Sequence, residues 1–260
     1  MTEEKKDLGY ITISEIQKLL KDYRIGKKPL AKLLGWGETT IIRYMDGDIP
    51  TIEYSNKLKE ILYNPCYFYQ ILVDNKENLT NIAFKKSKQS VLEKIMETKI
   101  NVVTQYIVNE YKADICAAQI QNLLYYVQGF SLALRDTPMF QDEYTITEVN
   151  VPFPQIYQDM RSRVVICLEL KENLLSMEEK ELIDSVIDAF SWYGPKALKS
   201  MASFEKTMLR ISRDKDNRKV ITKDIIKSYF TDLVKQYSIK RPCDIYKYPD
   251  ARLMDLKQLS

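Results

Sequence analysis

The spacing of apolar residues near the N-terminus predicts a series of short helices. Apolar side chains recur there every three or four residues, which is the period of one face of an α-helix. Ser14 and Gln17 predict a capping box that opens a first helix over about residues 15–24, and Pro29 suits the first position of a second helix. A third helix is expected over residues 37–46, so this region has the pattern of a small helical bundle.

The helical pattern is interrupted by a polar segment of linker quality. Thr51 and Pro65 open two further expected helices, and the polar run Asp-Asn-Lys-Glu-Asn follows at residues 74–78. We therefore place a domain boundary near residue 77, between a domain of residues 1–77 and a larger one of residues 78–260. Length supports this division, because 260 residues are more than one hydrophobic core usually organises.

The larger domain is expected to surround one buried helix. Residues 115–134 are apolar or aromatic on most faces, which is typical of a central helix covered by its neighbours. Ser176 is expected to cap a later amphipathic helix that contains Leu182, Val186 and Phe190. The β-branched residues within 164–170 favour a short strand.

The composition agrees with a compact, mainly helical chain. Hydrophobic residues make up 45% and charged residues 29% of the sequence, while 7 glycines and 9 prolines leave little material for turn-rich sheets. The 39 basic and 36 acidic residues give a formal charge of +3, which is too small for wholesale wrapping of nucleic acid or adhesion to a membrane. Any contact with a polyanion is expected to be local.

Histidine is absent from the sequence, which excludes Ser-His-Asp, Cys-His and HExxH chemistry. The scattered glycines form neither a GxGxxG nor a GxxxxGK phosphate loop, and no GxSxG motif is present. We therefore expect a protein that is not an enzyme, with no catalytic residues, no cofactor and no metal. A hydrolase built on Asp, Glu, Lys and Tyr stays formally open.

The cysteines and the N-terminal residues favour a cytoplasmic protein. The 4 cysteines, Cys66, Cys116, Cys167 and Cys243, form no CxxC pair, and we expect reduced, buried thiols. The chain starts with charged residues, and no apolar run approaches the roughly 18 residues that a membrane-spanning helix needs. The prediction is a cytoplasmic location without membrane contact.

Residues 33–47 have the pattern of a helix-turn-helix, with Gly35 in the turn and a second short helix that starts with polar residues. The run Leu-Leu-Gly-Trp-Gly-Glu-Thr-Thr-Ile-Ile-Arg-Tyr-Met-Asp-Gly resembles the Xre/Cro-type helix-turn-helix, particularly the branch found in antitoxin-like regulators. The resemblance implies these DNA contacts: Glu38, Thr39 and Thr40 at base edges, and Lys28, Lys32 and Arg43 at bases or phosphates. The alternative is a helical bundle whose charged surface is solvated, and Trp36 is interpreted as a packing anchor for the turn.

The long apolar helix carries a second resemblance. Its segment Gln-Asn-Leu-Leu-Tyr-Tyr-Val-Gln-Gly, residues 121–129, closely resembles the signature helix of the Panacea domain, a family that includes SocA-type antitoxins. The family's next turn and short strand have counterparts in Thr137–Phe140 and residues 144–149. Residues 150–157 depart from the family because they lack its Trp and Gly-Pro step, and residues 201–205 lack its usual histidine.

Together the two resemblances imply a mainly α protein, with a small N-terminal helix-turn-helix bundle and a larger, mostly helical domain with a small β element. They imply an antitoxin that neutralises its toxin by direct binding and represses its own operon. Tyr125 and Phe130 are assigned to the core, and the expected partner-binding residues are Tyr126, Thr137, Pro138, Phe140, Phe153 and Tyr157.

The expected partners are a cognate toxin protein and operator DNA, with a homodimer left open. The alternative function is a helix-turn-helix transcriptional regulator of a host, phage or plasmid. In that case the larger domain would sense a ligand or dimerise.

Overall fold

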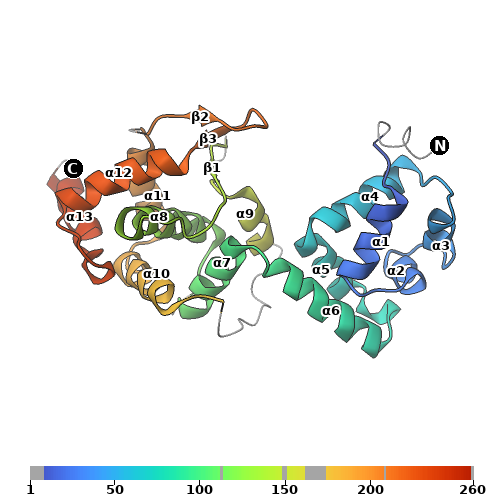
Figure 1. Cartoon of the computed structure of the whole chain (residues 1–260). Coiled ribbons are helices and arrows are strands. Elements are labelled where there is room, and N and C mark those ends of the chain that lie inside the picture. Colours follow the sequence, from blue (N-terminus) through green and yellow to red (C-terminus); the bar gives the residue numbers. More distant parts are fainter. Residues whose placement is uncertain (1–8, 112–113, 148–150, 162–173, 208, 259–260) are drawn as a thin grey trace. The chain divides into compact units, whose positions relative to one another are not determined.

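The computed structural model describes residues 9–111, 114–147, 151–161, 174–207 and 209–258 (Figure 1). The chain forms two compact units, one up to Glu97 and one from Thr98 onward. Both units consist mainly of helices, which confirms the predicted fold class.

Over residues 9–97, the described part of the first unit, the chain forms six α-helices and one 3-10 turn: α1 (Ile13–Asp22), α2 (Lys27–Leu33), α3 (Thr40–Met45), α4 (Ile52–Tyr63), α5 (Pro65–Asp74), η1 (Lys76–Asn78) and α6 (Asn81–Ile95). The capping box of α1 is formed by Thr12 and Glu15, two residues earlier than predicted, so the helix starts at Ile13. Pro29 is the third residue of α2 rather than the first, because Gly26 takes the cap position. The starts of α4 after Thr51 and of α5 at Pro65 are confirmed.

Tyr23 at the end of α1 holds the core of the first unit together. Its ring stacks on Phe68 of α5 at a centroid distance of 4.2 Å, and its hydroxyl donates to the Ile61 carbonyl oxygen at 2.8 Å. The buried hydroxyl is therefore satisfied while the ring fills the space between helices. α6 packs on α5 and also contacts α1, so it belongs to this unit. The division after Glu97 thus lies one helix later than the boundary predicted near residue 77, because the polar segment there is a turn between two packed helices.

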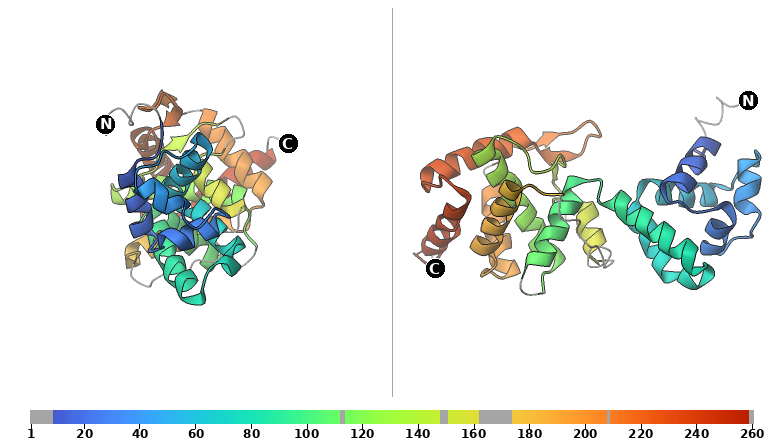
Figure 2. Two further views of the ribbon diagram at one scale, coloured as in Figure 1. Left: turned by 90° about the vertical axis from the view of Figure 1, so that its right-hand side faces the viewer. Right: turned by 60° about the horizontal axis from the view of Figure 1, so that its bottom comes forward.

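The second unit is built around α8 (Ala117–Arg135), as the apolar pattern predicted. α8 packs against α7 (Lys99–Glu110), α9 (Pro154–Arg161), α10 (Met177–Phe190), α11 (Pro195–Thr207) and α12 (Lys223–Gln236). Figures 1 and 2 show α8 in the middle of these helices. Tyr125 and Phe130 are buried in this core, which confirms their assignment.

A small antiparallel sheet lies beside the helices of the second unit, with the strand order β1-β3-β2. The strands are β1 (Tyr144–Thr145), β2 (Ser212–Arg213) and β3 (Lys219–Ile221). Tyr144 pairs with Ile221, and Ser212 pairs with Val220. Of the predicted strand over residues 144–149, Tyr144 and Thr145 form β1, and the Ile146 amide also donates to the Lys219 carbonyl oxygen at 2.8 Å. Residues 148–149 and the predicted strand at 164–170 lie outside the described residues.

The described residues of the second unit also form η3 (Pro242–Asp244) and α13 (Lys247–Gln258). The predicted cap of α10 is confirmed, since Ser176 and Glu179 form a capping box. The prediction of buried cysteines is right for Cys66 and wrong for Cys116 and Cys243, which are exposed because Cys116 precedes α8 and Cys243 lies in η3. Cys167 lies outside the described residues.

Candidate functional site

α2 and α3 pack against each other across a tight turn, which is the arrangement of a helix-turn-helix. Gly35 ends α2 with a φ of +70°, a conformation that favours glycine, and the Trp36 amide donates back to the Ala31 carbonyl oxygen at 2.8 Å. The Trp36 ring stacks on Tyr54 of α4 at 4.2 Å. Trp36 is therefore the packing anchor of the turn, as predicted.

The second helix of this motif is shorter than predicted. A turn in which the Thr40 amide donates to the Gly37 carbonyl oxygen at 2.9 Å precedes α3, so Glu38 and Thr39 lie before the helix and not within it. Ile41 and Tyr44 point into the unit, with exposed fractions of 0% and 8%, as predicted. Thr39 is exposed and Thr40 is half-buried, at the start of the helix.

The basic residues around α3 are exposed, and two of them are in ion pairs. The Lys32 ammonium lies 3.0 Å from Glu38, and the Arg43 Nε lies 2.7 Å from Asp48. The hydrogen bond from Lys32 lowers the pKa of the Glu38 carboxyl. Ion pairs between exposed side chains contribute about 0 to 1 kcal/mol, so a phosphate can replace either carboxylate at small cost.

In the second unit, two buried glutamines of α8 bind the backbone of two loops. The Gln128 side chain accepts from the Met139 amide and donates to the Phe140 carbonyl oxygen, both at 2.8 Å. Gln121 accepts from the Phe153 amide at 2.7 Å and donates to the Phe153 carbonyl oxygen at 3.2 Å. We call these two side chains the glutamine clamps. They explain physically why amides occur at these positions of the apolar helix, since each satisfies buried backbone groups.

Three of the predicted partner-binding residues are buried within the second unit, which contradicts their predicted role at the surface. Phe140 and Phe153 are 1% and 5% exposed, and their rings contact each other edge to face at 5.5 Å. Tyr126 is fully buried and stacks on Phe190 of α10 at 4.0 Å. Phe140 and Phe153 are therefore part of the core because the clamps draw their loops against α8, and Tyr126 is part of it because α10 covers its ring.

The other three predicted partner-binding residues reach the surface. Thr137 is exposed, and its carbonyl oxygen accepts from the Ser131 hydroxyl at 2.8 Å, while Pro138 and Tyr157 are half-buried. The loop that begins at Thr137 is thus held at both ends, by Ser131 and by the Gln128 clamp. A loop fixed in this way is suited to binding, because little conformational entropy remains to be lost.

Sequence analysis missed a buried carboxyl group in α11. The Oε1 atom of Glu205 accepts from the Tyr126 hydroxyl of α8 at 2.9 Å and from the Tyr248 hydroxyl of α13. Glu205 is completely buried, and this burial raises the pKa of its carboxyl group to about 7. The residue connects three helices of the core, and the sequence signals it only as an acid within an otherwise amphipathic helix.

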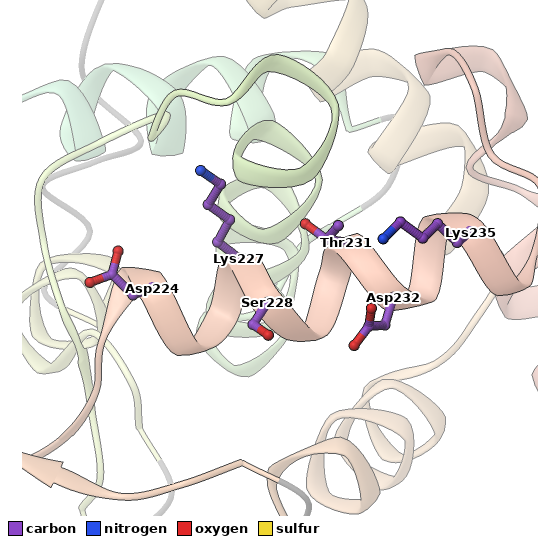
Figure 3. Close-up of a pocket in the computed structure, with 6 residues that line it drawn as sticks. All are labelled: Asp224, Lys227, Ser228, Thr231, Asp232 and Lys235. Atoms are coloured by element: carbon purple, nitrogen blue, oxygen red, sulfur yellow. The ribbon is translucent and has the colours of Figure 1, made fainter.

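An open polar depression runs along α12 (Figure 3). It is lined by Asp224, Lys227, Ser228, Thr231, Asp232 and Lys235. Asp224 and Asp232 lie about 12 Å apart along the helix axis, which is too far for a pair of catalytic carboxylates. Lys227 forms an ion pair with Asp136 at the end of α8, next to Thr137, so the depression borders the fixed loop.

Within the described ranges, no group of three or more acidic or cysteine side chains is arranged to hold a metal ion. No helix in the described part of the chain combines the length and apolar character needed to cross a bilayer. Comparisons of this chain with protein-family models, with curated proteins and with solved structures find no match.

Proposed function

We propose that this chain is a cytoplasmic antitoxin that neutralises a cognate toxin by direct binding and represses its own operon by binding operator DNA. The observation that carries the DNA-binding half is the α2–turn–α3 arrangement, with exposed basic side chains on and beside it. The toxin-binding half rests on the resemblance of residues 121–129 to the Panacea signature helix. The glutamine clamps support this resemblance, because Gln121 and Gln128 of the segment each bind the backbone of a loop.

In the DNA complex, α3 enters the major groove with Thr39 and Thr40 at base edges. Arg43 leaves Asp48 and binds a base or a phosphate, while Lys28 and Lys32 bind the backbone of the DNA. Glu38 lies close to the same surface and holds Lys32 in the free protein. Few basic residues take part, so the affinity depends on this one face of the unit.

Arg43→Ala should weaken binding to the DNA upstream of the chain's own gene by about 1 to 3 kcal/mol and change its sequence preference. Fluorescence anisotropy with a labelled duplex measures this effect. Lys76→Ala is the matched control, because Lys76 is an exposed basic residue of the same unit, in η1. If Arg43→Ala and the control bind the duplex with equal affinity, α3 is not the recognition helix.

The toxin-binding half is assigned to the second unit. A fragment of residues 98–260 should therefore protect cells from the toxin as well as the full chain does, while losing repression of the operon. Growth after induction of the toxin gene measures protection, and circular dichroism first establishes that the fragment is folded. A folded fragment that gives no protection would refute this division of labour.

The second candidate is a plain transcriptional regulator whose second unit senses a ligand or dimerises. The same helix-turn-helix favours it equally. The two functions differ in the partner of the second unit, because a regulator would bind operator DNA without a toxin.

A further inference from the structure

The outer side of α10 carries apolar side chains at both ends. Met177 begins the helix and is 87% exposed, and Trp192, in the turn after the helix, is 88% exposed. The chain has 2 tryptophans, and the other, Trp36, is packed on Tyr54. A tryptophan left this open is among the most effective contact residues in protein interfaces.

The turn that carries Trp192 is held in place by hydrogen bonds on both sides of it. The Ser191 carbonyl oxygen accepts from the Tyr111 hydroxyl at 3.3 Å. The Tyr193 amide donates to the Phe190 carbonyl oxygen at 3.1 Å, and the Tyr193 hydroxyl donates to Asp250 of α13 at 3.1 Å. The exposed ring is therefore presented from a fixed backbone, which limits the entropy lost when it binds.

Acidic residues connect the two apolar ends. Glu181, Asp184 and Asp188 follow Met177 at helical spacing and lie on the same side of α10, opposite the buried Leu182, Val186 and Phe190 side. Asp184 is half-buried and accepts from the Tyr106 hydroxyl at 2.9 Å. Glu181 and Asp188 are exposed, and Lys180 is the one basic residue within the helix sequence. We call the surface formed by Met177, Glu181, Asp184, Asp188 and Trp192 the α10 face.

We propose that the α10 face docks a basic surface of the toxin, with Trp192 inserted into an apolar pocket of that partner. This inference rests on the proposed antitoxin function and locates its binding surface. The charge of the face decides between occupants: carboxylates repel nucleic acid phosphates, and a two-fold contact between copies of the chain would set the acidic residues against each other. A partner with lysine or arginine side chains complements the face.

The binding test uses the purified full chain and, as the probe, the product of the gene adjacent to its own. Trp192→Ala should raise the dissociation constant about thirty-fold or more, which is the effect expected of a dominant interface residue. Asp188→Lys should weaken binding about tenfold at low salt and less at high salt, because screening removes the charge contribution.

Two exposed positions outside the face serve as matched controls. Ile82→Ala removes an 81% exposed apolar side chain from the first unit, and Asp232→Lys reverses an exposed acid of α12 (Figure 3). Both controls should bind as the unmodified chain does. If Trp192→Ala and Asp188→Lys also bind equally well, the toxin is bound elsewhere and the α10 face is refuted while the antitoxin function stands.

Fluorescence gives a direct readout of the tryptophan itself. In a Trp36→Phe variant Trp192 is the chain's one tryptophan, and with the emission of the probe alone subtracted, binding should shift its emission to shorter wavelength as the ring leaves water. An unchanged emission spectrum on saturation would overturn insertion of the ring. Failure of the unmodified chain to bind the probe at all would overturn the proposed function together with this inference.

Discussion

Gly129→Ala should destabilise the second unit by about 3 kcal/mol and lower its melting temperature by roughly 10 °C. Gly129 lies in the middle of α8, where a Cβ atom would come within 2.3 Å of Cε2 and Cζ of Phe230. Phe230 of α12 is fully buried and also contacts Tyr125 and Phe130 edge to face, so its ring cannot move aside without disturbing the core. Thermal unfolding followed by circular dichroism measures the effect.

Gly194→Ala is the matched control for this substitution. Nothing lies within 4 Å of the Cβ position of Gly194, so alanine should be tolerated there with little change in the melting temperature. Phe230→Leu combined with Gly129→Ala should recover part of the lost stability, because the smaller side chain vacates the overlapping volume. A fully stable Gly129→Ala variant would mean that α8 and α12 are not packed as closely as described.

The free energy of unfolding of the second unit should fall by about 3 kcal/mol as the pH rises from about 4.5 to about 7. Burial raises the pKa of Glu205 from an ordinary value of 4.5 to about 7. The folded state therefore holds a proton that the unfolded state releases at lower pH. The resulting stabilisation is complete below about pH 4.5 and is lost as the pH passes through 7.

The groups that set this titration lie on three helices around the carboxyl group. They are Tyr125 and Tyr126 of α8, Tyr229 of α12, and Tyr248 and Arg252 of α13. Burial favours the neutral carboxyl group, while the hydroxyls of Tyr248 and Tyr126 and the charge of Arg252 favour the ionised one. Glu205→Gln keeps an oxygen that accepts from Tyr126 and Tyr248 but does not ionise. The variant should match the unmodified chain at pH 4 and exceed its stability by about 3 kcal/mol at pH 8.5.

Chemical denaturation at several pH values measures this difference, with Asp232→Asn as the control at an exposed acid. The control should follow the unmodified chain at every pH. Parallel stability curves for Glu205→Gln and the unmodified chain would show that Glu205 does not titrate near neutral pH in the folded state.

Helix periodicity predicted most of the fold because one buried side per helix is a local property of the sequence. Residues 115–134 have apolar side chains on most faces, and α8 is indeed enclosed by its neighbours. The start of α1 was harder to predict, because the sequence offers two capping boxes. Thr12 can pair with Glu15, and Ser14 can pair with Gln17. Tertiary packing of α6 on α5 placed the division between the units after Glu97, a relation that no local pattern contains.

The candidate site was predictable only where a residue's exposure follows from its own helix. Arg43 and Lys32 are exposed because they lie opposite the buried Ile41 and Leu30 sides of their helices. Phe140 and Phe153 are buried because glutamines of α8 draw two loops inward, and Tyr126 is buried because α10 packs on it. The contact between Glu205 and Tyr126, like the exposure of Trp192, arises from helices distant in sequence and leaves no local signal.

The most direct test of the proposed function is co-expression of the full chain with the product of its adjacent gene. Growth is scored with and without the chain, and a tag on the chain is then used to purify any complex. The antitoxin function predicts that the neighbour alone arrests growth, that the chain restores growth, and that the two proteins co-purify in a fixed ratio. A harmless neighbour, or restored growth without a complex, would contradict neutralisation by direct binding.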